Sequence, residues 1–422
     1  MLVSNEMKVT PQRLINLSLI CLLLLQIVSY ARAEWICETN IWSNRILLYK
    51  YAYSNKIMEA VRFALLFAIL IATLILPKYK SRPWIYIIAI AGFSLIYSVE
   101  AITDIGISRA IYSGNLPLIY LLVTGFLVGR KESVWNGVKK IIPLFVLVYV
   151  MLFSYEFIDS YSQFGWAVYQ NSSMMTYYAH LFWLSVAYIY MCITENKFKG
   201  LVYPLLIILC IGSFLLRSRS WVIQAILLLI ITAFTMYKRK KRSINSIIKG
   251  FVVVSVIAIV AIVLLTTYFS QFVESLIEKG DVDSRSFQYI EMLEQVEPYK
   301  WLFGQGMTAT YVSKLYGEYT FIDNEIFYMS FHYGIFFAIT YFVPYLMAFV
   351  GCFKYRRNMR FWLFSALVIF LWIASVNGLS VFNRIHLDIK SFIMPLLAGH
   401  IYQTAIDSTK NGVNDEDTIH SR

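Results

Sequence analysis

Long apolar stretches recur along almost the whole chain, and they constrain its fold more than any other feature. Each stretch of about 17 to 25 mainly apolar residues is long enough to cross about 30 Å of hydrocarbon as an α-helix. About twelve such spans are predicted, at residues 14–31, 58–76, 84–99, 110–128, 141–158, 177–193, 201–216, 220–237, 247–269, 325–350, 361–380 and 390–406. The span 84–99 is short, and the span 390–406 is interrupted by Pro395 and Gly399. The predicted fold is all-α and polytopic, with residues 1–422 forming a single membrane domain.

The composition excludes a water-soluble globular protein. Hydrophobic residues make up 59% of the 422 residues and charged residues only 15%, so no core of this size hides the apolar surface. Many of the aromatic residues, which make up 17%, lie at span ends, as is typical of membrane interfaces. The cysteines show no paired spacing, which argues against a disulfide framework or a zinc site. They are Cys21, Cys37, Cys192, Cys210 and Cys352.

Clusters of lysine and arginine fall in alternate loops between the predicted spans. They are Lys78, Lys80 and Arg82; Arg130, Lys131, Lys139 and Lys140; residues 238–242; and Lys354, Arg356, Arg357 and Arg360. Basic loops stay on the cytoplasmic side, so both termini are predicted to be cytoplasmic. The net charge of +12 therefore reflects membrane topology, and no nucleic-acid partner is expected. Residues 31–33 formally resemble a signal-peptidase site, but the first span is predicted to stay uncleaved.

One long hydrophilic segment, residues 270–323, interrupts the apolar pattern and is predicted to be a large outer loop. Ser284 is expected to cap a short helix in it, which places Arg285 in the first turn of that helix. A cation gains nothing from the helix dipole there, so a nearby anion is the favoured partner of Arg285. The alternative is a surface arginine that pairs with Asp281 or Asp283. The apolar face of this helix is predicted to lie on the membrane or the bundle, with the glutamates facing elsewhere. That face consists of Phe287, Ile290, Leu293 and Val296, and the glutamates are Glu291, Glu294 and Glu297.

Arg217-Ser218-Arg219 is the whole outer connection between two predicted spans. An arginine costs roughly 2.5–3.5 kcal/mol at mid-membrane and less near the interface, so two in so short a turn need a reason. One reason is that both side chains snorkel to lipid phosphate. The other is an anion site, because a guanidinium matches phosphate oxygens bidentately and stays charged. The anion site is favoured, since snorkelling arginines usually mark the cytoplasmic side.

Residues 303–309 formally satisfy the GxGxxA pattern of dinucleotide-binding proteins. No hydrophobic strand precedes them and no βαβ unit follows, so this interpretation is rejected. The glycines are instead expected to form a tight turn that brings the outer loop back to the bundle.

Asp323-Asn324-Glu325 marks the end of the outer loop at the mouth of the next predicted span. Carboxylates at such a boundary are candidates for a general base or for contacts to sugar hydroxyls. His332 follows Glu325 by two helical turns and is expected on the same face. The alternatives are that Asp323 only caps the helix and that His332 is a packed, hydrogen-bonded residue. The last predicted outer loop adds Arg384 and His386 on the same side.

Several of these motifs, taken in order, resemble the O-antigen polymerase and ligase superfamily of bacterial inner membranes. They are the Ser-Arg turn at residues 218–219, Asp-Ser-Arg at 283–285, Phe-Gly-Gln-Gly at 303–306, and Asp-Asn at 323–324 with Gly334 ten residues on. The resemblance covers roughly residues 200–350, and the first half of the chain matches only in topology.

The resemblance implies an outer-facing cavity that binds an oligosaccharide on undecaprenyl diphosphate, and transfer of the sugar chain without a metal or nucleotide cofactor. Arg217, Arg219 and Arg285 are then the expected diphosphate contacts. Asp323 and Asn324 are expected near the acceptor hydroxyl. Ligases of the superfamily typically carry His-Asn at this position, and the Asp-Asn pair here favours a polymerase. The base stays open, with three candidates: Asp323, Glu325 and His332.

The expected protein is thus a metal-independent glycosyltransferase of the bacterial inner membrane with a periplasmic site, which polymerises O-antigen or a related surface polysaccharide. A ligase that transfers the chain to lipid A core is the first alternative. A polysaccharide flippase is the second, but it is expected to carry charges in mid-span positions of both halves. The expected partners are lipid-linked repeat units, membrane lipid, and a chain-length regulator and flippase of the same pathway.

Overall fold

A computed structural model describes about two thirds of the chain. The described residues are 10–37, 55–75, 84–107, 123–168, 172–195, 199–238, 284–306, 309–314, 317–319, 322, 324–354, 361–376 and 389–410. Almost all of them are helical, and the only strands among them form a two-stranded antiparallel hairpin. The prediction of an all-α membrane protein is therefore confirmed.

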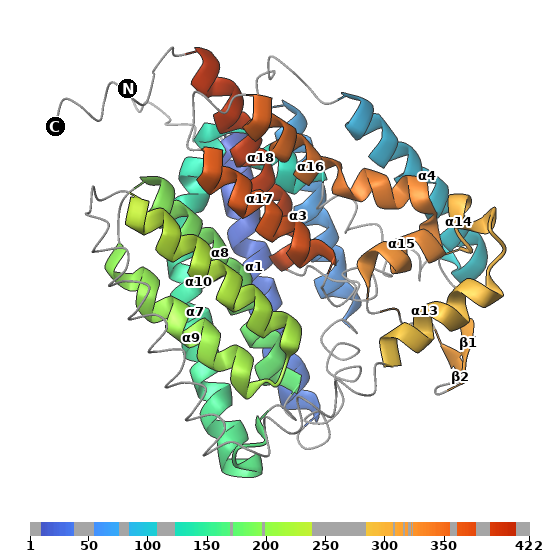
Figure 1. Ribbon diagram of the computed structural model, residues 1–422, viewed down its shortest axis with the longest axis horizontal. Helices are drawn as coiled ribbons and strands as arrows, with labels where there is room; N and C mark the ends of the chain where they lie inside the picture. The colour runs from blue at the N-terminus through green and yellow to red at the C-terminus, as the bar shows by residue number, and fades with distance from the viewer. Residues whose placement is uncertain are drawn as a thin grey trace, which may run out of the picture.

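The helices run α1 (Pro11–Cys37), α3 (Lys56–Ile75), α4 (Trp84–Ile105), α7 (Glu132–Phe164), α8 (Ser172–Glu195), α9 (Val202–Leu215), α10 (Arg219–Lys238), α13 (Ser284–Gln295), α14 (Lys300–Phe303), α15 (Glu325–Tyr333), α16 (Ile335–Lys354), α17 (Phe361–Val376) and α18 (Ile389–Lys410). A short 3₁₀ helix, Lys199–Leu201, precedes α9, and residues 123–129 are helical as well. Strand β1 (Tyr311–Ser313) pairs with β2 (Gly317–Tyr319). Figure 1 shows α13, α14, α15 and the hairpin gathered beside α4 at one side of the helical bundle.

In the described part of the chain, five helices are long and apolar enough to cross a membrane. They are Pro11–Trp35, Lys56–Ile75, Ile85–Ile105, Glu132–Phe164 and Ile335–Lys354. Other predicted spans coincide with helices that are shorter or more polar, whereas the predicted span 247–269 and most of the predicted span 110–128 lie outside the described residues. The number of about twelve spans and the outer location of residues 270–323 stay predictions.

Glycines let residues 123–129 and α18 pack backbone against backbone. A Cβ atom added to Gly129 would lie 2.0 Å from the carbonyl oxygen of Leu396, and one added to Gly399 would lie 2.2 Å from that of Phe126. Small residues four apart allow this close approach of apolar helices, and Gly125 and Gly129 supply that spacing. The glycine that interrupts the predicted span 390–406 is therefore a packing residue within one continuous helix.

The predicted single span at residues 325–350 is wrong, because the chain breaks at Gly334. Helix α15 ends at Tyr333, Gly334 has φ 86° and ψ 161°, and α16 begins at Ile335. This left-handed backbone conformation is accessible to glycine at little cost. The break redirects the chain, so α15 is a separate short helix at the head of α16.

Helix α13 is attached to the hairpin by its polar side chains. The amide group of Gln295 donates from Nε2 to the carbonyl oxygen of Val312 (2.7 Å) and accepts at Oε1 from its backbone N–H (2.8 Å). Glu291 Oε1 accepts from the backbone N–H of Lys314 at 3.1 Å. These side chains take the place of a neighbouring strand along β1.

Only part of the predicted apolar face of α13 packs against the protein, and the contact of the rest with a membrane stays a prediction. Val296 is buried as expected, but Ile290 and Leu293 are 53% and 52% exposed. Gln288 and Met292 are buried with Glu291, so the inward face combines polar and apolar residues. The hairpin explains the difference, because it offers backbone partners that make the burial of α13's polar side chains favourable.

Candidate functional site

Two glycines far apart in sequence pack against each other where α14 meets the break between α15 and α16. Gly304 and Gly334 both have φ 86°. A Cβ on Gly304 would lie 2.4 Å from the carbonyl oxygen of His332, and a Cβ on Gly334 would lie 2.3 Å from that of Leu302. No side chain fits at either position. The predicted tight turn that returns the loop to the bundle is therefore confirmed.

The same turn caps the C-terminal end of α15. The backbone N–H of Gln305 donates to the carbonyl oxygen of Phe331 at 2.7 Å, and that of Gly306 donates to His332 at 3.1 Å. Helix ends leave such carbonyls without intrahelical partners. The Phe-Gly-Gln-Gly segment thus satisfies the end of α15 and fixes its position.

His332 holds this turn from the other side. Its Nδ1 lies 2.9 Å from the carbonyl oxygen of Gly306, and its ring packs on Tyr328 and Phe331, with ring centroids 4.3 and 4.9 Å apart. In the neutral ring Nδ1 then carries the proton. His332 is only 2% exposed. The structure therefore gives His332 a packing and hydrogen-bonding role, and its predicted role as a base stays a prediction.

Glu325, the first residue of α15, forms a buried ion pair with Lys390 of α18. Glu325 is 0% exposed, and its Oε1 lies 3.3 Å from Lys390 Nζ. Its Oε2 accepts from the hydroxyl of Tyr341 on α16 at 2.9 Å. Lys390 Nζ also lies 5.9 Å from the ring centroid of Trp183 on α8. The carboxylate of Glu325 thus ties the start of α15 to α16 and to the start of α18.

Asn324 is the N-cap of α15. Its Oδ1 accepts from the backbone N–H groups of Ile326 (2.9 Å) and Phe327 (3.3 Å). The alternative that Asp323 caps this helix is therefore wrong, since the next residue takes that place. With Oδ1 engaged, Asn324 is left with its amide Nδ2 as a donor toward a ligand hydroxyl. Asp323 itself lies outside the described residues.

Arg217 occupies a strained turn between α9 and α10. Its φ of 48° is the only positive value outside glycine among the residues that the structure describes. Its backbone N–H donates to the carbonyl oxygen of Phe214 at 2.9 Å, which closes the turn. Such strain costs roughly 1–3 kcal/mol and clusters at functional sites. The predicted short connection is confirmed, and Arg219 follows as the first residue of α10.

Arg285 is the second residue of α13, as predicted. Tyr289, one turn later on the same helix, stacks on Phe327 of α15 with ring centroids 4.7 Å apart and planes 13° apart. Position 285 is therefore on the side of α13 that approaches the start of α15. The side chains of Arg219 and Arg285 lie outside the described residues, as do the whole of Arg384 and His386.

Three polar residues of this region were not predicted from the sequence. Lys390 and Tyr341 bind Glu325, as described above. Glu100 on α4 lies against the glycine-rich turn, because a Cβ on Gly306 would be 2.5 Å from its Oε1. Glu100 and Lys390 each lie at the border of a predicted apolar span. Charged residues are common there, so the sequence did not indicate a functional role for either. Within the described residues, no group of three or more His, Cys, Asp or Glu side chains is placed to hold a metal ion.

Comparison with known proteins gives one match. The sequence model of the family described as O-antigen ligase matches residues 204–339, about a third of the chain. No curated protein and no solved structure matches. The matched region runs from α9 into α16 and contains Arg217, Arg219, Arg285 and Glu325, whereas Lys390 and Glu100 lie outside it. The resemblance inferred from the motifs is therefore confirmed for this region.

Proposed function

We propose that this chain, which matches the O-antigen ligase family over residues 204–339, is a surface-polysaccharide polymerase. The match supports a polymerase- or ligase-type glycosyl transfer in surface-polysaccharide biosynthesis. In the proposed reaction, a glycan chain leaves undecaprenyl diphosphate and joins a new lipid-linked repeat unit at the periplasmic face of the inner membrane. The Asp-Asn pair at residues 323–324, where ligases of the superfamily typically have His-Asn, favours this reaction over transfer to lipid A core.

The strained turn at Arg217 is the observation that carries the proposal. Arg217 has a left-handed backbone conformation that costs free energy, whereas a glycine at this position would be unstrained. A function of the arginine side chain explains why it is present. A guanidinium binds a diphosphate through parallel charge-assisted hydrogen bonds. We assign Arg217, with Arg219 and Arg285, to the diphosphate of the donor.

In the reaction the bond between the anomeric carbon and the diphosphate oxygen breaks, and the diphosphate leaves with the electron pair. Cations placed at this oxygen stabilise the charge that develops there. The acceptor hydroxyl oxygen forms the new bond to the anomeric carbon and gives its proton to a base. We propose Asp323 as this base, because Glu325 and His332 are each held in contacts inside the protein.

The ion pair between Glu325 and Lys390 is proposed to position the site. Glu325 directly follows Asn324, the cap residue, in the sequence, and its ion pair fixes the start of α15 relative to α18. Sites of this kind require supporting residues that hold the reacting groups within about 0.5 Å of their productive positions. A chain-length regulator and a flippase of the same pathway are the proposed protein partners.

The lipopolysaccharide pattern of a strain that lacks this chain tests the proposal. Loss of the ladder with a single repeat unit still attached to core supports a polymerase. Complete loss of attached repeats indicates a ligase or a flippase instead. Accumulation of full-length polymer on the undecaprenyl carrier then separates the ligase from the flippase.

A further inference from the structure

Helix α7 changes from polar to apolar along its length. Its first residues, 132–140, include one glutamate and two lysines, and the apolar run begins at Ile141. The helix therefore begins nine residues before the predicted span 141–158. Lysines at the edge of an apolar run lie at the level of lipid phosphates. Lys139 and Lys140 occupy this level on α7.

A cavity of about 500 Å³ lies between α7 and α8 at this level. Its α7 wall consists of Asn136, Lys139, Lys140 and Pro143, and its α8 wall of Met191, Cys192 and Glu195. The wall is polar toward the start of α7 and apolar farther along it. A phosphate group with an attached acyl chain has this same polarity.

A second cavity, of about 310 Å³, lies on the other side of α7 against α1. It is lined by Gln12, Asn16, Ile20, Asn136, Gly137, Lys140 and Ile141. Asn136 and Lys140 line both cavities and form a ridge between them. Each cavity is polar toward the start of α7 and has apolar residues farther along it, which suits a molecule with one polar head and two apolar chains.

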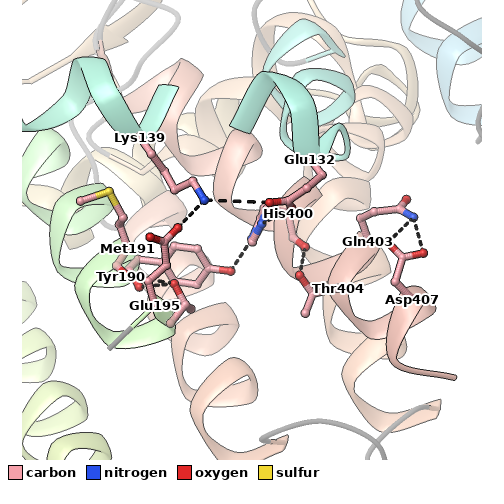
Figure 2. A network of polar contacts seen from close by, with 10 residues as sticks. Glu132, Lys139, Tyr190, Met191, Glu195, His400, Gln403, Thr404 and Asp407 are labelled. Carbon is pink, nitrogen blue, oxygen red and sulfur yellow. Dashed lines mark hydrogen bonds and ion pairs between the residues drawn. The ribbon is translucent and has the colours of Figure 1, made fainter. Parts of the chain in front are cut away.

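The two lysines differ in their partners, as Figure 2 shows for Lys139. Lys139 forms ion pairs with Glu195 and, at 3.9 Å, with Glu132, which in turn lies 3.6 Å from His400 Nε2. Lys140 is exposed and forms no ion pair within the part of the chain that the structure describes. Lys140 is therefore the cation that remains for an external anion.

We propose that the ridge of Asn136 and Lys140 binds the headgroup phosphate of an anionic phospholipid. Lys140 supplies the charge, and the Asn136 amide, which also hydrogen-bonds the Glu132 carboxylate, supplies its second N–H as a donor. One acyl chain lies along Pro143 and Met191, and the other lies along Ile20 and Ile141. The apolar walls favour a lipid over a soluble phosphate, because a soluble anion gains nothing from them.

Native mass spectrometry of the full-length protein with phosphatidylglycerol in mixed micelles tests this proposal. Lys140→Gln should lower the affinity for phosphatidylglycerol about fivefold, the effect typical of one basic residue at a membrane surface. Lys56→Gln is the matched control, since Lys56 is an exposed lysine at the start of α3 outside both cavities, and it should leave binding unchanged. Equal losses in both variants, or no loss in Lys140→Gln, would overturn the proposal.

A second variant changes binding in the opposite direction. Glu195→Gln removes a carboxylate from the wall of the larger cavity and releases Lys139 from its ion pair. Phosphatidylglycerol should then bind severalfold more tightly, whereas a weaker or unchanged affinity contradicts the assignment. Competition separates the two sources of phosphate: inorganic phosphate should not displace the lipid, and displacement at millimolar concentration would show a site for a soluble anion.

Discussion

Gly304 and Gly334 fill one another's missing side-chain space, so that the turn after α14 and the break before α16 form a single backbone-to-backbone contact. Each has a left-handed φ of 86°, and a Cβ on either would lie within 2.4 Å of a carbonyl oxygen of the opposite segment. The contact places the turn at residues 304–306 on the head of α16.

Gly334→Ala should destabilise the protein strongly. This φ/ψ region alone costs a non-glycine residue roughly 1–3 kcal/mol, and the contact with Leu302 adds to that cost. The melting temperature of the purified protein in detergent measures the effect. Gly92→Ala is the control, because Gly92 lies within α4 with no other atom near its Cβ position, and it should leave the melting temperature unchanged or raise it.

Lys390→Met should lower the stability of the protein more than the double variant, Lys390→Met with Glu325→Gln, does. Removing one partner of a buried ion pair costs about 3–5 kcal/mol, because the other charge stays buried, whereas removing both charges avoids that cost. Denaturation of the single and double variants gives the comparison. Lys300→Met is the control, since its ion pair with Glu297 is exposed at 3.5 Å, and little change is expected. Equal stabilities of Lys390→Met and wild type would contradict the structure.

Arg217→Gly separates the strain at this turn from the role of its side chain. Glycine relaxes the left-handed backbone, so the melting temperature should stay the same or rise, while the loss of the diphosphate contact should abolish polymer. The lipopolysaccharide ladder at matched protein levels measures the second effect. Arg217→Lys should rescue polymer only in part, because an ammonium lacks the bidentate geometry. A full ladder from Arg217→Gly, and from Arg219→Ala and Arg285→Ala, would refute the diphosphate assignment.

Asp323→Asn should remove polymer without unfolding the protein. The substitution keeps the shape of the side chain and removes its charge, and the helix keeps its cap because Asn324 provides it. Asn324→Ala is the structural counterpart and should cost about 1 kcal/mol of stability. Wild-type polymer from Asp323→Asn, together with loss of polymer in Glu325→Gln or His332→Ala, would move the base to one of those residues.

Reporter fusions should place Lys240 in the cytoplasm and Glu297 in the periplasm. The expectation follows from the alternation of basic loops along the sequence. A reporter active only in the periplasm should therefore give signal at Glu297 and none at Lys240. The reverse pattern would invert the topology and move the arginine turn to the cytoplasmic side.

Local patterns in the sequence were sufficient for most of the described helices and for the turn at residues 304–306. Apolar runs located most of the described long helices, and the two glycines at 304 and 306 correctly indicated a tight turn, because both signals act over a few residues. The break at Gly334 was missed because a single glycine inside an apolar run also fits a continuous helix. Its partner, Gly304, lies 30 positions away in sequence.

The partners of the candidate residues were beyond prediction for the same reason. Glu325 and Lys390 are 65 positions apart, and no local spacing connects them. The inward face of α13 depends on the hairpin. Backbone groups of the hairpin region accept a hydrogen bond from Gln295 and donate hydrogen bonds to Gln295 and Glu291. Helical periodicity alone predicts that these two polar residues face the solvent.

Helix α18 has Lys390 near its start and His400 ten positions later, which is about 15 Å along the helix axis. Between them, Gly399 and Leu396 touch the backbone of residues 123–129. A larger side chain at this contact would push the whole helix outward and shift both polar contacts together. The geometry of the polar contacts at both ends of this stretch of α18 thus depends on a single helix–helix spacing, so a change that one end tolerates is limited by the fit at the other.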